Sequence, residues 1–428
     1  MILKIVARVV ATLMAVSLTS AAETLTFRQA IELALKNSGQ MQAAAADITR
    51  ADAAYREVRN QYLPQVVTGS GLGYSIGFPL TLEGSAPSLF NVNSQQTVLN
   101  FSVGDFKRAT EAEKSAAMLQ SRDTRSTVIL NAALTYTQLD LATQKMNALL
   151  EQQKSAERAE FVTTQRAQEG LESQLELSRS KLAAARVRMR IAEGQTAIDV
   201  LRERLAKLTG LAPTSIETDT KSVPAPPQVN QQASLAESAA GASPLVKSVE
   251  EKARAAELKA RGEKRGLWPS IDLASQYALL SKFNNYEEFY QRFERHNFTF
   301  GLAFRVPVLN FVQKAHADVA AADAVKARKE AENTRNQFAE DTLKLQRTVR
   351  QLSVAQEVAK LDYEVTNAEI DQVEARLNSG NGTLRDVELA RVQAQDKFAT
   401  YLDSTFELYR AQMQLMRLTG KLEAWALN

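Results

Sequence analysis

Few side chains in this sequence have the types and spacing that catalysis or metal binding requires. His296 and His316 are its only histidines, and no second nitrogen or thiolate ligand accompanies either of them. Cysteine is absent. No pairing of nucleophile and base and no glycine-rich phosphate-binding loop is evident. The sequence therefore predicts a protein that is not an enzyme and that uses neither a metal nor another cofactor.

One combination of residues that could take part in binding or chemistry occurs twice. It consists of a glycine, a hydroxyl residue and an acid at equal spacing. The two copies are Gly170, Ser173 and Glu176, and Gly380, Thr383 and Asp386. An acid in the first turn after Ser or Thr is typical of a helix start, where it is stabilised by the free backbone amides. A helix cap is therefore one interpretation of Asp386.

Both acids lie beside the turn of a predicted helical hairpin. The second hairpin, from Phe311 to Gly420, contains no Pro and is rich in residues that favour helix. Its first leg, 311–377, would be about 100 Å long. Apolar residues on the two legs form narrow coiled-coil seams. They are Val354, Val358, Leu361, Val365 and Ala368 on the first leg, and Leu402, Phe406, Tyr409, Met413 and Met416 on the second. The first hairpin is expected from helices at 106–169 and 173–209.

Residues 1–22 have the character of a secretory signal peptide. Lys4 and Arg8 flank an apolar stretch, and residues 20–22 are small enough for cleavage. A membrane anchor is the alternative, but the apolar run is shorter than the ~20 residues that a span needs.

After this segment the positive and negative charges nearly balance, so the sequence gives no support for a nucleic-acid partner.

Four segments alternate between apolar residues and small or polar residues, as β-strands between two different solvents do. They are expected at about 65–77, 94–104, 270–281 and 296–308. Between Pro64 and Asp105 the only charged residue is Glu83. The small and polar faces suit a water-filled lumen. The residues predicted to face lipid are Phe298, Phe300, Leu302, Phe304, Leu99 and Phe101.

Matched intervals relate the two halves of the chain. Residues 39–64 and 244–269 both span 25 positions, and residues 170–210 and 380–420 both span 40. Leu-Thr-Gly ends both of the longer intervals. The predicted organisation is repeat 1 at 23–211, an irregular linker at 212–230 and repeat 2 at 231–428, with hairpin tips at 168–173 and 378–383.

Four strands cannot close a membrane barrel alone. Every backbone group in hydrocarbon must be paired, and bacterial barrels have at least about eight strands. The chain must therefore oligomerise. Two copies would give eight strands around a filled interior, and three would give twelve strands around a lumen.

The sequence resembles the TolC-type outer-membrane efflux channels from Leu25 to Leu422. Short motifs at matching places carry this resemblance. They are Leu25-Thr26-Phe27 with Ala30 and Ala34, Tyr62-Leu63-Pro64, Leu267-Trp268-Pro269, Val306-Pro307-Val308-Leu309, the two tip patterns and the two Leu-Thr-Gly motifs. Two places depart from the family pattern. Asn37-Ser38-Gly39 replaces the expected Asn-Pro, and Val103-Gly104-Asp105 lacks the Pro of its counterpart.

The resemblance implies a membrane α+β fold with four transmembrane β-strands per chain in a shared trimeric β-barrel, continued by a long periplasmic α-helical barrel. It implies an outer-membrane location and a passive exit duct for efflux or type I secretion. The implied partners are two further copies, outer-membrane lipid, a periplasmic adaptor protein and an inner-membrane transporter. The sequence does not indicate which cargo such a duct would carry.

The resemblance also assigns roles to the tips. The adaptor would contact Gly170, Ser173, Gly380, Gly382 and Thr383. The periplasmic gate of the family is a ring of acids, for which Asp386 and its first-repeat counterpart Glu176 are the candidates. Leu389 stands where a second acid would be expected one turn later. The alternative function is a periplasmic adaptor or another soluble coiled-coil protein, which would carry one long hairpin and no lipid-facing strands.

Overall fold

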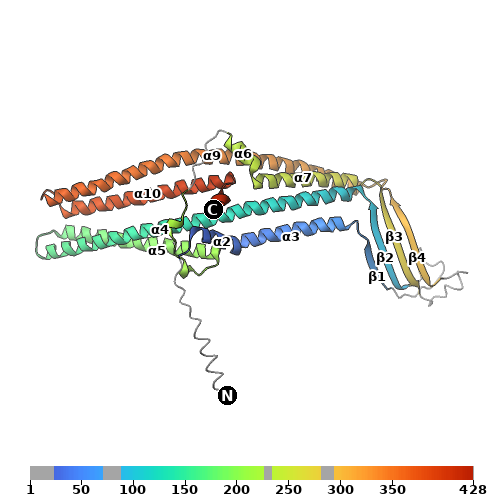
Figure 1. Cartoon of the computed structure of the whole chain (residues 1–428), viewed down its shortest axis with the longest axis horizontal. Coiled ribbons are helices and arrows are strands. Elements are labelled where there is room, and N and C mark those ends of the chain that lie inside the picture. Colours follow the sequence, from blue (N-terminus) through green and yellow to red (C-terminus); the bar gives the residue numbers. More distant parts are fainter. Residues whose placement is uncertain (1–23, 71–87, 226–233, 281–293, 428) are drawn as a thin grey trace, which may run out of the picture. The chain divides into compact units, whose positions relative to one another are not determined.

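Two helices of equal length, α4 (Phe101–Gln168) and α9 (Phe311–Asn378), run through the computed structural model in Figure 1, each with 68 residues. The structure describes residues 24–70, 88–225, 234–280 and 294–427. The predicted signal peptide, part of the first predicted strand (71–77), part of the linker (226–230) and residue 281 lie outside the described residues.

The chain divides into two compact units. Unit 1 comprises residues 1–42, 124–243 and 339–428, and unit 2 comprises 43–123 and 244–338. The long helices contribute a segment to each unit. Among the described residues, no helix combines the length and the apolar character that spanning a membrane requires.

Each long helix is the first leg of a hairpin (Figure 1). The chain turns from α4 into α5 (Gln174–Thr209) and from α9 into α10 (Leu384–Leu418). Arg190 of α5 and Asp396 of α10 form an ion pair at 2.7 Å, and Lys145 of α4 pairs with Asp403 of α10. Helix α10 therefore contacts both legs of the first hairpin.

The remaining described helices are short or of medium length. They are α2 (Phe27–Asn37), α3 (Gly39–Asn60), α6 (Leu235–Ala242), α7 (Pro244–Arg265), α11 (Leu422–Leu427) and the 3₁₀ turns η2 (Pro213–Ser215) and η3 (Thr220–Ser222). Helices α3 and α7 have 22 residues each, and each leads directly to a strand.

Unit 2 contains one antiparallel sheet of four strands in the order β1-β2-β3-β4. Its strands are β1 (Gln65–Gly69), β2 (Ser88–Leu99), β3 (Ser270–Leu280) and β4 (His296–Arg305). Sequence neighbours are therefore also sheet neighbours, and both edges of the described sheet belong to the first and last strands.

The second strand lies earlier than the sequence predicted. It ends at Leu99 rather than near 104, and Phe101 is the first residue of α4, so its assignment to a strand was wrong. Asn100 explains the change, because its Oδ1 accepts hydrogen bonds from the backbone N of Ser102 at 3.0 Å and from the Ser102 hydroxyl at 2.6 Å. This side chain caps the helix and ends the strand. The fourth strand also stops early, at Arg305 instead of 308.

The core of unit 1 forms around α2. The Phe27 ring packs edge-on against Tyr136 of α4 and Trp425 of α11, with centroid distances of 5.6 and 5.5 Å. The buried Tyr136 hydroxyl donates to the Leu25 carbonyl at 2.6 Å and accepts from the Asp219 amide at 2.8 Å. These contacts bring the start of the described chain, its end and the segment after α5 into one core.

In unit 2, α4 packs against α7 through a buried ion pair. Asp105 is fully buried, and its Oδ2 lies 2.8 Å from Nη1 of Arg265. Nearby, a Cβ at Gly262 would come within 2.8 Å of the Phe106 ring, so glycine allows the two helices to approach. Charge pairing and close packing thus join these helices beside the sheet.

Candidate functional site: the hairpin tips and the sheet

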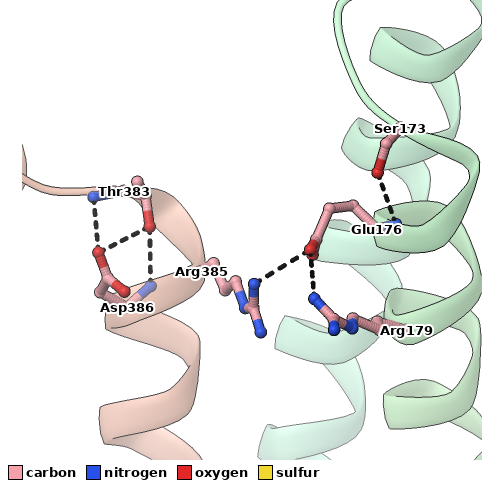
Figure 2. A network of polar contacts seen from close by, with 6 residues as sticks. All are labelled: Ser173, Glu176, Arg179, Thr383, Arg385 and Asp386. Atoms are coloured by element: carbon pink, nitrogen blue, oxygen red, sulfur yellow. Dashed lines mark hydrogen bonds and ion pairs between the residues drawn. The ribbon is translucent and has the colours of Figure 1, made fainter.

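Both tips begin their second helix with a hydroxyl cap (Figure 2). The Ser173 Oγ accepts a hydrogen bond from the Glu176 amide at 3.1 Å, and the Thr383 Oγ1 accepts one from the Asp386 amide at 3.2 Å. At the second tip the capping is reciprocal, because the Asp386 Oδ2 accepts from the Thr383 amide at 3.0 Å and from its hydroxyl at 2.7 Å. Asp386 therefore caps α10, which is one of the two roles that the sequence left open.

Capping preserves the charge of Asp386. The hydrogen bonds from the Thr383 hydroxyl and amide hold the pKa of this carboxyl below its usual value of 3.8, and the neighbouring Arg385 guanidinium lowers the pKa further. The side chain is therefore a carboxylate at neutral and mildly acidic pH. A cap and a charged ring are compatible roles for one residue.

Glu176 has different surroundings from Asp386. Its Oε1 lies 2.7 Å from Nη1 of Arg179 on the same helix and 3.0 Å from Nη1 of Arg385 on α10 (Figure 2). Arg385 thus connects the two hairpin tips. Because two guanidinium groups contact this carboxylate, Glu176 has less uncompensated charge than Asp386.

The sequence reasoning missed Arg385. It lies directly before Asp386, but its partner is 209 positions away along the chain. Its significance depends on the packing of α10 beside α5, which no local spacing encodes. A basic residue inside the tip pattern was the only available signal.

Glycines shape both turns. Gly170 and Gly380 have φ angles of 73° and 77°, in the left-handed region that glycine adopts without strain. At Gly382 a Cβ would lie 3.0 Å from the backbone N of Leu377, so the chain passes too close for a larger residue. Leu171 beside the first turn is 65% exposed, and Leu389, one turn after Asp386, is also exposed.

The described sheet has two chemically different faces, because residues paired directly across antiparallel strands share a face. One face is mostly apolar: Val66, Thr68, Phe90, Val92, Ser94, Gln96, Leu99, Ile271, Leu273, Ser275, Tyr277, Leu279, His296, Phe298, Phe300, Leu302 and Phe304. The other face is small and polar: Gln65, Val67, Gly69, Asn91, Asn93, Gln95, Thr97, Asp272, Ala274, Gln276, Ala278, Asn297, Thr299, Gly301, Ala303 and Arg305.

The apolar face is uncovered within the described chain. Phe298, Phe300, Leu302 and Phe304 of β4 are 56–70% exposed, and Leu99 lies on the same face. Such a contiguous apolar patch marks a surface that contacts lipid or protein. On the polar face, Arg305 and Asp272 pair at 3.6 Å.

Leu99 reaches the apolar face through an irregularity that the sequence did not reveal. A register shift between Thr97 and Leu99 places these two residues on opposite faces, whereas simple alternation predicted a shared face. A bulge adds one residue to a strand and reverses the alternation beyond it.

Among the described residues, no group of three or more His, Cys, Asp or Glu side chains could hold a metal ion. The candidate functional features of the described chain are therefore the two hairpin tips and the sheet. The described chain thus combines a sheet that has one apolar and one polar face with two long helical hairpins.

Three solved structures show the same fold. The outer membrane protein VceC from Vibrio cholerae is 17% identical, with 92% of this chain and 96% of that chain covered and a TM-score of 0.76. The CmeC outer membrane channel of Campylobacter jejuni is 16% identical, with coverages of 92% and 86% and a TM-score of 0.76. The MtrE outer membrane channel of Neisseria gonorrhoeae, in its open state, is 16% identical, with coverages of 94% and 90% and a TM-score of 0.75.

Residues 30–211 match the model of the family described as outer membrane efflux protein. No curated protein sequence matches the chain. This match covers the first repeat and agrees with the resemblance to TolC-type channels that the motifs indicated. The fold of the described chain is that of the outer-membrane channels above, with a four-stranded sheet and two helical hairpins in each chain, and not the single long hairpin expected for a soluble adaptor.

Proposed function

We propose that three copies of this chain form a passive exit duct, which receives substrates from an inner-membrane transporter through a periplasmic adaptor protein. In this assembly the strands form one barrel of twelve strands, and the hairpins continue it as a helical cylinder. The two halves of each chain act as structural repeats. The duct serves a tripartite efflux system or a type I secretion system.

The two-faced sheet carries this proposal. Lipid would cover the apolar face with Phe298, Phe300 and Phe304, and water would fill the lumen beside the polar face with Asp272 and Arg305. Within the described sheet, β1 and β4 each have one edge without a strand partner. Because unpaired backbone groups are costly in hydrocarbon, these edges must pair with other copies.

The tips supply the proposed entrance. Asp386 carries a negative charge that the cap of its own helix stabilises by hydrogen bonds, so three copies around an axis would form an anionic ring. The Glu176–Arg385 pair holds the two hairpins of one chain together at the same end. The glycine turns and the exposed Leu171 offer a docking surface for the adaptor.

The proposal is tested in native membranes. The protein is expected in the outer-membrane fraction as a heat-modifiable, detergent-dependent trimer that forms discrete conductance steps in planar bilayers. Lipid-soluble carbene reagents should label Phe298, Phe300 and Phe304 but spare Thr299 and Ala303. A freely soluble monomer, or labelling that ignores this alternation, would refute the proposal.

A further inference from the structure

Exposed basic residues gather where α7 meets the sheet. Arg261 and Lys264 lie three residues apart on one face of α7, and Trp268 follows on the same face just after the helix ends. All three residues are exposed, Trp268 by 50%. The backbone N of Trp268 donates to the Arg265 carbonyl at 3.0 Å, so the helical turn continues to this position. Two cations therefore precede an exposed aromatic residue on one surface.

The first repeat has the same arrangement 205 positions earlier. Arg56 and Arg59 are exposed on α3, and the exposed Leu63 stands in the place of Trp268. Helix α3 also leads into the sheet (Figure 1). Arg56 pairs with Asp52 at 3.1 Å. Two cations followed by a large apolar residue thus occur at both junctions, and α7 carries the aromatic form.

Helix α7 has neighbours from its own chain on two sides. Lys259 pairs with Glu113 of α4 at 2.5 Å, and the Glu263 carboxylate accepts from the Gln313 side chain of α9 at 2.7 Å. Because both lateral contacts form within one chain, the exposed face with Arg261 points toward neither neighbour. In the wall of a tube, such a face meets what lies outside the tube or inside it.

A chain of contacts connects this face with the apolar face of the sheet. Leu99 and Ile271 are paired on that apolar face, and just beyond them the Phe101 ring packs edge-on against the Trp268 ring at 5.3 Å. The Arg265 guanidinium lies 5.6 Å from the centre of the Trp268 ring. Apolar residues, aromatic rings and a cation therefore follow one another from the sheet into α7. A protein meets the hydrocarbon, the interface and the headgroups of a bilayer in this order.

Positive charge exceeds negative charge at this junction. Arg265 and Arg108 flank the buried Asp105 carboxylate, with Nη1 atoms 2.8 and 3.9 Å from its two oxygens, and the Arg108 side chain is 67% exposed. Within the part of the chain that the structure describes, Arg261 and Lys264 form no ion pair. The dipole of α7 stabilises cations in its last turn, but it explains neither Arg261 nor Arg108, which lie outside that turn. A negatively charged partner beside the helices would stabilise all of these cations.

We propose that this junction binds the phosphate groups of anionic glycerophospholipids in the membrane leaflet nearest the helices. The site rests on the proposed channel function, to which it adds a specific lipid partner. Arg261 and Lys264 would contact the phosphate, and Trp268 with Phe101 would lie against the glycerol and the first acyl carbons. A guanidinium binds phosphate through parallel hydrogen bonds, and a lysine can extend toward headgroups while its stem stays beside apolar surface.

Lipid binding to the purified trimer tests this site. The wild-type protein in detergent should retain added phosphatidylglycerol, which native mass spectrometry counts as extra mass on the trimer. Arg261→Gln with Lys264→Gln should bind phosphatidylglycerol about tenfold more weakly, because each cation near an anionic lipid surface contributes severalfold to the affinity. Trp268→Ala should weaken binding by a smaller factor, since it removes only the aromatic contact.

The matched control removes two cations from the other end of the same helix. Lys247→Gln with Lys252→Gln changes the net charge equally, about 20 Å from the junction, and should bind phosphatidylglycerol like the wild type. Glycerol phosphate, added at the same concentration as the lipid, should leave the lipid bound, because the free headgroup lacks the contacts with Trp268.

Three results would overturn the inference. They are equal phosphatidylglycerol binding by Arg261→Gln with Lys264→Gln and the wild type, an equal loss in the control variant, and displacement of the lipid by glycerol phosphate. Each is measured on an intact trimer that conducts in planar bilayers, so the proposed duct would remain. Failure of the duct would appear instead as a soluble, non-conducting wild-type protein.

Discussion

At the scale of single residues, two acids that match in the sequence differ in their surroundings. Glu176 contacts two arginines, and Asp386 contacts the cap of its own helix. Both acids follow a hydroxyl residue at the same spacing, so the sequence could not separate them. The difference arises from Arg385, which reaches Glu176 across the two hairpins.

Replacing Asp386 with Ala should raise the single-channel conductance of the closed protein in planar bilayers, because an anionic ring at the entrance binds cations and restricts flow. The control is Thr383→Ala, which removes the capping hydroxyl but keeps the acid. An unchanged conductance in Asp386→Ala, or an equal rise in Thr383→Ala, would contradict the gate assignment.

The depressed pKa of Asp386 predicts a particular pH dependence. A carboxyl whose folded pKa lies below its usual 3.8 stays charged from pH 7 down to pH 5 and loses its charge only as the pH falls through that lowered value. Cation selectivity that depends on Asp386 should therefore be constant between pH 7 and 5. Reversal potentials in a salt gradient measure it, and a change near pH 6 that disappears in Asp386→Ala would contradict the expectation.

At the scale of elements, α4 and α7 are joined by a buried charge pair that the sequence did not single out. Asp105 and Arg265 lie on helices that are distant in the chain, and Asp105 has no exposure to solvent. Buried pairs of this kind are costly to break because the remaining ion has no water around it. The pair therefore matters more to the junction beside the sheet than the many exposed ion pairs do.

Arg265→Ala should destabilise the protein by about 3 kcal/mol, because it removes the nearer cation from the buried Asp105 carboxylate and leaves only Arg108, whose Nη1 lies 3.9 Å from Oδ1. The double variant Asp105→Leu with Arg265→Met should regain most of this loss. Thermal unfolding in detergent, followed by circular dichroism, measures both. Equal stability of Arg265→Ala and the wild type would contradict the stabilising role of this ion pair.

At the scale of the whole molecule, the different chemistry of the two faces of the sheet requires a different environment on each side. Phe300 and Thr299 are adjacent in β4 and lie on opposite faces, so in the proposed channel lipid and water would meet the strand on different sides. Neither face is a hydrophobic core of the described chain. This is the observation that supports the proposed assembly of several copies in a membrane.

Phe300→Arg should reduce the amount of trimer in the outer membrane, since a charged residue on the lipid face costs about 2–4 kcal/mol near the middle of the bilayer. Thr299→Arg on the polar face is the matched control and should assemble normally with altered conductance. Heat-modifiability on gels measures the trimer. Equal loss in both variants would contradict the assignment of the faces.

Several features of this protein were readable from the sequence. Periodicity located the long helices, the two glycine turns and the alternating strands, because these patterns follow from local backbone geometry. The faces of β4 followed from the same alternation. Local composition could not locate the end of β2, because Phe101 and Val103 continue the apolar alternation of a strand. The helix cap at Asn100 ends the strand before them.

Only the tertiary structure decided which distant residues meet. The Arg385–Glu176 pair, the buried Asp105–Arg265 pair and the shift that turns Leu99 toward the apolar face depend on how helices and strands pack. Local propensities act over a few residues, whereas these contacts join segments separated by much of the chain. The spacing of residues along a sequence therefore reports local propensities and carries little information about contacts between distant segments.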